Sequence, residues 1–129
     1  MAAAAVLSVG NAVVASAQTA ANVAVVINEE SPASIQIGEY YVRKRGIPEA
    51  NVIRIRTKAD EPIGRPAYAG SIELPIALAL RTRGLQDRIL YLVLTKGVPL
   101  KISGPPGLTG TMATVDAELT LLYLSLIHI

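Results

Sequence analysis

The sequence predicts a three-layer α/β fold, in which a parallel sheet carries helices on both faces. Two short, continuous apolar runs, Val23–Ile27 and Ile89–Leu94, are typical of strands that are buried on both faces of a parallel sheet. Segments with helix start and stop signals lie between them, so that strands and helices alternate. We therefore expect a β-α-β-α-β unit of the Rossmann-like or flavodoxin-like kind, with right-handed crossovers.

The first helix is expected over Pro32–Arg45. Ser31 can cap its free amides, Pro32 suits the first helical position, and Gly46 supplies a stop. The three basic residues of the last turn meet the exposed carbonyls of the helix dipole, which explains them without a phosphate or membrane contact. The face predicted to lie on the sheet recurs at three- and four-residue spacing: Ala33, Ile37, Tyr40, Tyr41 and Lys44.

The next two elements follow from partial alternation and from turn residues. Val52–Arg56 alternates enough to predict a strand nearer the sheet edge, with its arginines on the wetter face. The segment Thr57–Ala67 is rich in Pro and Gly and is predicted to be a loop. Ser71 is then expected to open a second helix that runs to about Arg83, where Pro75 can bend the first turn.

The last elements are a strand, a loop and a helix. Ile89–Leu94 is expected to be the third strand and to be central, and Gly104–Gly110, with three Gly and two Pro, is a loop. Thr114 is a plausible cap for a third helix, with negative charge favoured in its first turn. Its inner face is predicted to comprise Val115, Leu119 and Leu122.

Composition bounds the function more than it reveals it. The 129 residues, 51% of them apolar, suffice for one domain, and a net charge of +2 gives no reason to expect a nucleic-acid partner. There is no Cys, and the only His is His128, so neither a Ser-His-Asp nor a Cys-His site can be assembled from Gln18 to Tyr123. Catalytic residues are therefore unknown. No dinucleotide or P-loop motif names a cofactor, and no metal ligand set is indicated.

The amino terminus resembles a secretory signal peptide over residues 1–17. Ala2–Val14 is an apolar run too short to cross a bilayer, and Ala15-Ser16-Ala17 offers the small residues that signal peptidase requires. We expect cleavage before Gln18, export to the periplasm or cell surface, and no stable membrane span afterwards. The alternative is an Ala-rich leader on a cytoplasmic protein, because no Lys or Arg precedes the run.

Candidate binding residues lie where parallel strands end. In open α/β sheets ligands settle at the carboxyl ends of strands, which makes Asn28, Thr95, Lys96 and Asp116 weak ligand-binding candidates. Lys96 could hold an anionic group, although a simple turn with a solvated lysine explains it equally well. Asp116 and Glu118 could act as acid, base or metal ligands, or merely favour the start of a helix.

Four segments resemble a family of exported bacterial proteins: Asn22–Ser34, Ile37–Pro48, Gly84–Leu100 and Val115–Leu122. The family occurs chiefly in bacteria that carry exosortase, the proposed transpeptidase for proteins with a PEP-type carboxyl-terminal signal (PEP-CTERM). Its members are longer and their activity is not established. The resemblance therefore implies export and a genomic setting, and it assigns no catalytic residue.

The ending Leu124–Ile129 does not suit that family and looks like translated sequencing-adapter read-through. We therefore expect residues 18–124 to be the amino-terminal part of an α/β domain truncated at the C-terminus, and residues 125–129 to be a non-native tail. Two functions remain open besides a cytoplasmic nucleotide-binding or signalling domain, against which Ala15-Ser16-Ala17 argues. One is a noncatalytic exported domain with an envelope protein or polysaccharide as partner. The other is the first part of a caspase-like or gingipain-like hydrolase whose catalytic residues lie in the missing portion.

Overall fold

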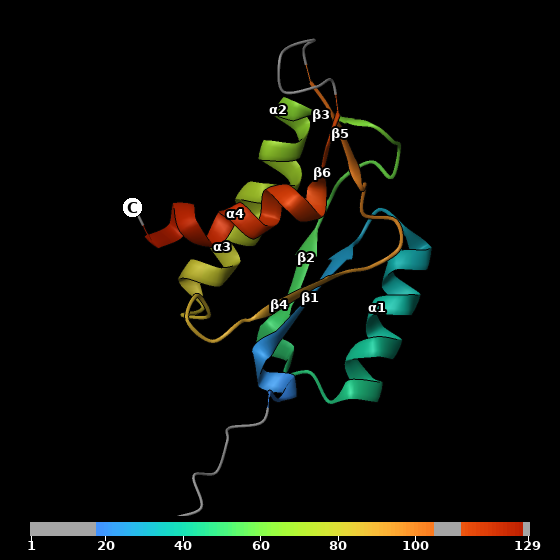
Figure 1. The fold of residues 1–129 in the computed structure, drawn as a ribbon. Helices are drawn as coiled ribbons and strands as arrows, with labels where there is room; N and C mark the ends of the chain where they lie inside the picture. Colours follow the sequence, from blue (N-terminus) through green and yellow to red (C-terminus); the bar gives the residue numbers. More distant parts are fainter. Residues whose placement is uncertain (1–17, 105–111, 128–129) are drawn as a thin grey trace, which may run out of the picture.

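The computed structural model describes residues 18–104 and 112–127, which form a mixed α/β fold around a parallel sheet (Figure 1). The sheet holds β1 (Val23–Asn28), β2 (Val52–Ile55) and β4 (Tyr91–Leu94) in the order β2-β1-β4, and both pairings are parallel. β1 is nearly all buried, as its apolar run predicts. The predicted α/β class with a parallel sheet is confirmed.

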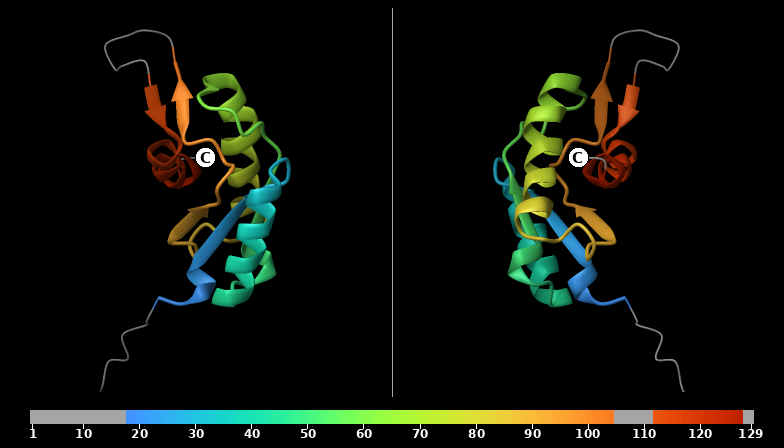
Figure 2. Two further views of the ribbon diagram at one scale, coloured as in Figure 1. Left: turned by 90° about the vertical axis from the view of Figure 1, so that its right-hand side faces the viewer. Right: turned by 90° about the vertical axis from the view of Figure 1, so that its left-hand side faces the viewer.

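Helices cover both faces of this sheet, which gives three layers (Figure 2). α1 (Pro32–Arg45) packs on the face that presents Val25 and Ile27. α3 (Leu74–Thr82) and α4 (Val115–Ile127) pack on the opposite face in a larger apolar cluster. The predicted inner face of the last helix is confirmed, because three of its residues are buried in that cluster: Val115, Leu119 and Leu122.

The ends of α1 agree with the prediction, but its buried face does not. The Ser31 side chain accepts a hydrogen bond from the Ser34 amide, and Gly46 ends the helix in a left-handed conformation at φ 62°. However, Ile37 and Tyr40 are 43% and 58% exposed. The helix therefore turns Ile37 and Tyr40 outward, while Tyr41 of the predicted face packs partly against the sheet.

A close approach between α1 and β1 explains this rotation. Gly38 and Ser34 are the fully buried residues of α1, and a Cβ atom on Gly38 would lie 2.5 Å from Cγ1 of Ile27. Only a glycine admits that contact, so the small residues face the sheet. Apolar spacing could not reveal this, because it weighs large side chains and ignores how closely two backbones approach.

The second helix begins earlier than Ser71, so the predicted loop Thr57–Ala67 was too long. β3 (Ile63–Gly64) and α2 (Arg65–Tyr68) both start within that segment. The helix begins at Arg65 because Gly64 is extended and Pro66 lies in the first turn. Amides of the first turn have no acceptor within the helix, so the missing amide of Pro66 costs no hydrogen bond there. Inside the helix, the Ser71 hydroxyl donates to the Ala67 carbonyl at 2.6 Å instead of capping an end.

A π-helical turn, η3 (Ala69–Glu73), joins α2 to α3. The Leu74 amide donates to the carbonyl of Ala69, five residues back. Pro75 follows directly; it has no amide, and its ring would crowd the carbonyl four residues before it in a regular α-helix. The buried residues of the composite helix recur at intervals of four: Tyr68, Ile72, Ile76 and Leu80.

The prediction that Ile89–Leu94 forms the central strand was wrong for the part of the sheet that the structure describes. β1 is central, while β4 lies at an edge and begins with Tyr91, which is 46% exposed. Leu92 and Leu94 pack partly against the larger apolar cluster although β4 lies at an edge, so an apolar run did not distinguish an edge strand from a central one. The prediction that Val52–Arg56 lies nearer an edge is confirmed.

A second small sheet was not predicted. It holds β3, β5 (Lys101–Ser103) and β6 (Met112–Thr114), with β5 parallel to β3 and antiparallel to β6. Its strands are too short for a clear alternation, although Ile102 is fully buried in the larger cluster.

The remaining predictions lie outside the described residues: those for residues 1–17, for 105–110 of the Gly- and Pro-rich loop and for His128. Of the tail, 125–127 belong to the last turns of α4.

Candidate functional site

The carboxyl edge of the sheet brings Asn28 and Thr95 together in a buried polar network. The side-chain amide of Asn28 donates to the carbonyls of Thr57 and Gly97, both at 2.8 Å. Its oxygen accepts from the amides of Glu30 and Thr57, at 3.1 and 3.2 Å. All four bonding positions of this side chain are therefore used, and they join the loops that follow β1, β2 and β4.

The hydroxyls of Ser34 and Thr95 form a chain of hydrogen bonds beside Asn28. The Asn28 amide donates to Ser34 Oγ at 2.8 Å, and the Thr95 hydroxyl donates to the Val26 carbonyl at 2.8 Å. The two hydroxyl oxygens also share a short hydrogen bond. Since the Thr95 proton is directed to Val26, Ser34 must be the donor in that bond. Both hydroxyls thus tie α1 to the sheet, with no proton left to give to a ligand.

Gly97 closes the network from the β4 side. Its φ of +101° is one that side chains rarely adopt, and a Cβ there would lie 2.2 Å from Ser31 Oγ. A glycine at this position lets the backbone approach a neighbouring side chain closely. The close neighbour in the structure is Ser31, the cap of α1, and so this approach already serves the fold.

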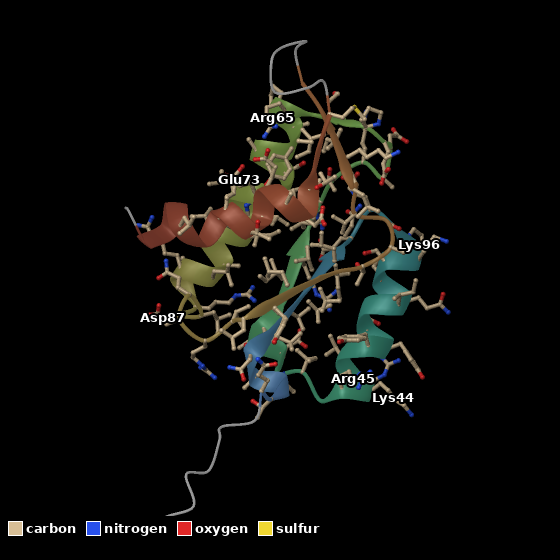
Figure 3. The ribbon with its side chains drawn as sticks, in the orientation of Figure 1. Lys44, Arg45, Arg65, Glu73, Asp87 and Lys96 are labelled. Atoms are coloured by element: carbon tan, nitrogen blue, oxygen red, sulfur yellow. The ribbon has the colours of Figure 1, made fainter. Side chains whose placement is uncertain are left out.

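Lys96 and Asp116 do not join that network. Lys96 is exposed at the edge near the start of α1 (Figure 3), and no carboxylate of the described residues pairs with it. Asp116 lies at the start of α4, where a hydrogen bond with the Thr114 side chain, aided by the Ala117 amide, lowers its pKa. Thr114 directly precedes the first helical residue, at the cap position that the sequence predicts.

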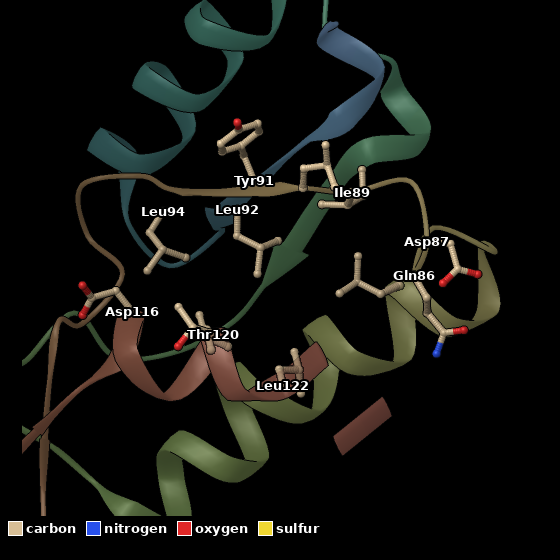
Figure 4. Close-up of a pocket in the computed structure, with 12 residues that line it drawn as sticks. Gln86, Asp87, Ile89, Tyr91, Leu92, Leu94, Asp116, Thr120 and Leu122 are labelled. Atoms are coloured by element: carbon tan, nitrogen blue, oxygen red, sulfur yellow. The ribbon is translucent and has the colours of Figure 1, made fainter. Parts of the chain in front are cut away.

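A groove of about 480 Å³ runs between β4 and α4 (Figure 4). The β4 side contributes Tyr91, Leu92 and Leu94 to its lining, and α4 contributes Asp116 and Thr120. Sequence reasoning missed this site, because it depends on where α4 settles beside β4. The available signal was the absence of any charge from Ile89 to Leu94.

Two other carboxylates close to the candidate residues, Glu29 and Glu118, are used in ion pairs. Glu29 accepts a hydrogen bond from Arg56 at 2.8 Å, and Glu118 lies 3.1 Å from Arg65. Within 18–104 and 112–127, no group of three or more Asp, Glu, His or Cys gathers as a metal site would require. These glutamates therefore have a structural explanation.

One buried hydroxyl stands apart from both regions. Tyr68 is 1% exposed, and its hydroxyl has no hydrogen-bond partner among the described residues. Burial raises the pKa of Tyr68, the nearby charges of Glu73 and Glu118 raise it further, and Arg65 opposes them. The neutral phenol is therefore strongly favoured in the folded state.

No family model, curated protein or solved structure matches the chain. Across the described helices, none has the length and apolar character needed to cross a bilayer. Function must therefore be argued from the polar edge and from the groove.

Proposed function

We propose that this chain is an exported α/β domain that binds an envelope protein or polysaccharide in exosortase-bearing bacteria, without carrying out a reaction itself. The apolar leader, the Ala15-Ser16-Ala17 segment and the family resemblance support export and this setting. The observation that carries a binding role is the groove between β4 and α4, whereas the closed network at the carboxyl edge argues against a reaction there. Its hydroxyls and amide bond to one another, whereas a reacting group needs a free nucleophile beside a base.

We propose further that the fold is of the flavodoxin-like kind. Numbered along the chain, the strands of the main sheet lie in the order 2-1-3, with which the flavodoxin-like sheet also begins. In the Rossmann order the third strand lies beyond the second. The strand order therefore favours the second of the two predicted forms.

Export is tested by the mature amino terminus. The full chain is expressed in a bacterium with a periplasm, and the intact mass is measured in each cell fraction. We expect the periplasmic protein to begin at Gln18. Ala17→Glu should block processing, because signal peptidase needs a small residue there, while Ala12→Ser should leave it unchanged. An unprocessed chain found only in the cytosol would refute export.

The hydrolase alternative is favoured by one observation, the divergence of connections beside β1 and β4. β1 leads into α1 on one face of the sheet, and the chain after β4 leads to α4 on the other. Such a divergence is where doubly wound proteins place their active sites. Sequencing of the gene tests this: if strands are encoded beyond residue 129 and end in His and in Cys or Ser, the hydrolase role replaces the binding role.

A further inference from the structure

The amino-terminal edge of the main sheet gathers cationic side chains from two helices. In a parallel sheet the connecting helices run against the strands, so α1 and α3 both end beside the amino ends of the strands (Figure 1). We call the exposed cations at these helix ends and in the connection that follows α3 the basic edge: Arg43, Lys44, Arg45, Arg81, Arg83 and Arg88.

The basic edge lacks the ion pairs that other cations form. The three ion pairs of the described residues involve none of its members: Arg54–Glu39, Arg56–Glu29 and Arg65–Glu118. The connections at this edge hold two carboxylates, Glu49 and Asp87, and neither forms an ion pair with a described cation. Six cations against two carboxylates leave an excess of positive charge at one end of the molecule.

Helix dipoles explain only part of this edge. They account for cations in the last turn of a helix, but Arg88 lies in the connection between α3 and β4. Its carbonyl accepts a hydrogen bond from the Asn22 side chain at 2.9 Å, directly before β1. The Arg83 side chain donates to the carbonyls of Ala50 and Val52 at 3.0 and 2.7 Å. These bonds fix segments from three parts of the chain in one platform.

The cations at the end of α1 point in different directions. Successive residues of an α-helix are about 100° apart, so Arg43, Lys44 and Arg45 are spread around more than half of the helix end. Lys44 and Arg45 lie at this end in Figure 3. Charges arranged in this way suit a plane of negative charge that faces the helix end, since a single small ligand could not meet all three.

Tyrosines adjoin these cations. Tyr40 is 58% exposed one turn before Lys44, and the guanidinium of Arg45 lies 5.8 Å from the centre of the Tyr41 ring. Tyrosine is enriched where a bilayer meets water, because its ring is apolar and its hydroxyl is polar. Lys and Arg beside such rings attract anionic lipids. This combination favours a phospholipid surface over a soluble polyanion, which offers no apolar layer.

The proposed leader is joined to the protein at the same edge. β1 begins there, and only Gln18–Asn22 separate it from residue 17. A signal peptide lies in the membrane during export, so the domain would emerge with the basic edge next to the bilayer.

We propose that the basic edge binds the surface of a membrane that contains anionic phospholipids. The domain then stands on the ends of α1 and α3, and the carboxyl edge of the sheet is directed away from the bilayer. This inference rests on the proposed export. It goes beyond the proposed binding of an envelope protein or polysaccharide, because it uses a different surface, which belongs to α1, α3 and their connections and does not involve the outer side of β4.

The first test measures flotation of the full 129-residue chain with lipid vesicles. One set contains about 30% phosphatidylglycerol in phosphatidylcholine, and the other contains phosphatidylcholine alone. We expect about tenfold or more tighter binding to the anionic vesicles at low salt, and a loss of this difference as salt is raised. Insertion of the apolar leader would contribute equally to both sets, so the difference between them reports the basic edge.

The second test compares two triple variants that each remove three exposed positive charges. The variant at the basic edge should weaken binding to anionic vesicles about tenfold or more, and the control less than about twofold. The control lysines lie toward the opposite end of the molecule and form no ion pair with a described residue. Thermal unfolding checks that both variants fold. The variants are Arg43→Gln/Lys44→Gln/Arg45→Gln and, as the control, Lys58→Gln/Lys96→Gln/Lys101→Gln.

Several results would overturn the inference: equal binding to both sets of vesicles, equal weakening by the two triple variants, or binding to dextran sulfate with no binding to anionic vesicles. Inorganic phosphate at matched ionic strength should not displace the protein, and displacement would mean that the edge binds the free ion instead of a surface. Export is measured separately. A cytosolic chain that binds anionic vesicles refutes the export proposal alone, and an exported chain that does not bind them refutes this inference alone.

Discussion

The carboxyl edge of the sheet and the groove along β4 meet at Leu94 and Thr95, yet they treat polar groups in opposite ways. At the edge, Asn28 satisfies every donor and acceptor of its side chain within the protein. Along the groove, backbone groups of β4 face outward without a strand partner among the described residues. The comparison teaches that a place where the connections after neighbouring strands diverge to opposite faces of the sheet is not by that fact a binding site. A ligand needs groups that the fold has left without partners.

The largest expected effect is at the centre of the closed network. Asn28→Asp places a carboxylate against the carbonyl oxygens of Thr57 and Gly97, so we expect a loss of about 4 kcal/mol in the free energy of unfolding at pH 7. Urea denaturation measures it. Gln36→Glu, on the exposed side of α1, is the control and should cost about 0.5 kcal/mol or less. Equal costs would mean that the network is not closed.

Gly97→Ala should come next, at about 3 kcal/mol, because it combines an unfavourable φ with a clash against Ser31. Gly84 separates the two causes. It also has a positive φ, 62°, but no atom lies within 4 Å of the place that an added Cβ would take. Gly84→Ala should therefore cost only about 1 kcal/mol in thermal or urea unfolding. If both variants lose the same amount, Ser31 does not pack as closely as the structure indicates.

Thr95→Val keeps the shape of the side chain and removes its hydroxyl. Ser34 then loses its acceptor and the Val26 carbonyl loses a donor, so we expect a loss of about 1.5 kcal/mol by urea denaturation. Thr120→Val removes an exposed hydroxyl from the groove wall and should cost less than about 0.5 kcal/mol. A reversed order would contradict the distinction between a closed edge and an open groove.

Tyr68 is the contrasting case of a buried hydroxyl that lies outside the network and has no hydrogen-bond partner among the described residues. Tyr68→Phe removes a hydroxyl without a described partner, so we expect stability to stay within about 1 kcal/mol of the parent or to rise. Because the folded-state pKa of Tyr68 is raised, the unfolded chain loses this proton first as the pH climbs past about 10. Stability should therefore fall above that pH, and the fall should be smaller in Tyr68→Phe. Urea midpoints at pH 8 and 11 measure this, and an identical fall in both proteins would contradict it.

The smallest effect on stability is expected at the groove. Leu90 is 60% exposed, so Leu90→Lys should change the free energy of unfolding by no more than about 0.5 kcal/mol. The added charge should nevertheless raise solubility, because charges on an edge strand hinder association between edges. Sedimentation and the solubility limit measure this. Glu49→Lys, outside the groove lining, should leave association unchanged.

Local signals predicted much of the fold. Ser31, Pro32 and Gly46 located both ends of α1, since caps act within a few residues of the chain. Continuous apolar runs located β1 and β4. These local signals could not predict the order of the strands in the sheet. An apolar residue such as Leu92 is expected both in a central strand and in an edge strand whose face is covered by a helix.

The candidate site was predicted only in part. Asn28 and Thr95 follow their strands and so meet at one edge, as expected. Asp116 could not be assigned to a separate groove, because its neighbours depend on how α4 crosses the end of β4. Gly38 was equally hidden, since a glycine within a helix gives no sign of the side chain that will pack against it.

The π-helical turn η3 determines which side of the helix faces the core before and after it. A regular α-helix advances about 100° per residue, so twelve residues would leave Leu80 roughly 120° out of line with Tyr68. The π-helical winding over Ala69–Glu73 offsets much of this rotation, and both side chains reach the same core. This segment therefore aligns the two halves of the helix on one apolar stripe. Deleting Gly70 would let a regular α-helix cover the remaining eleven steps, which end only about 20° out of line, so Tyr68 and Leu80 should stay on one stripe without the π-helical turn.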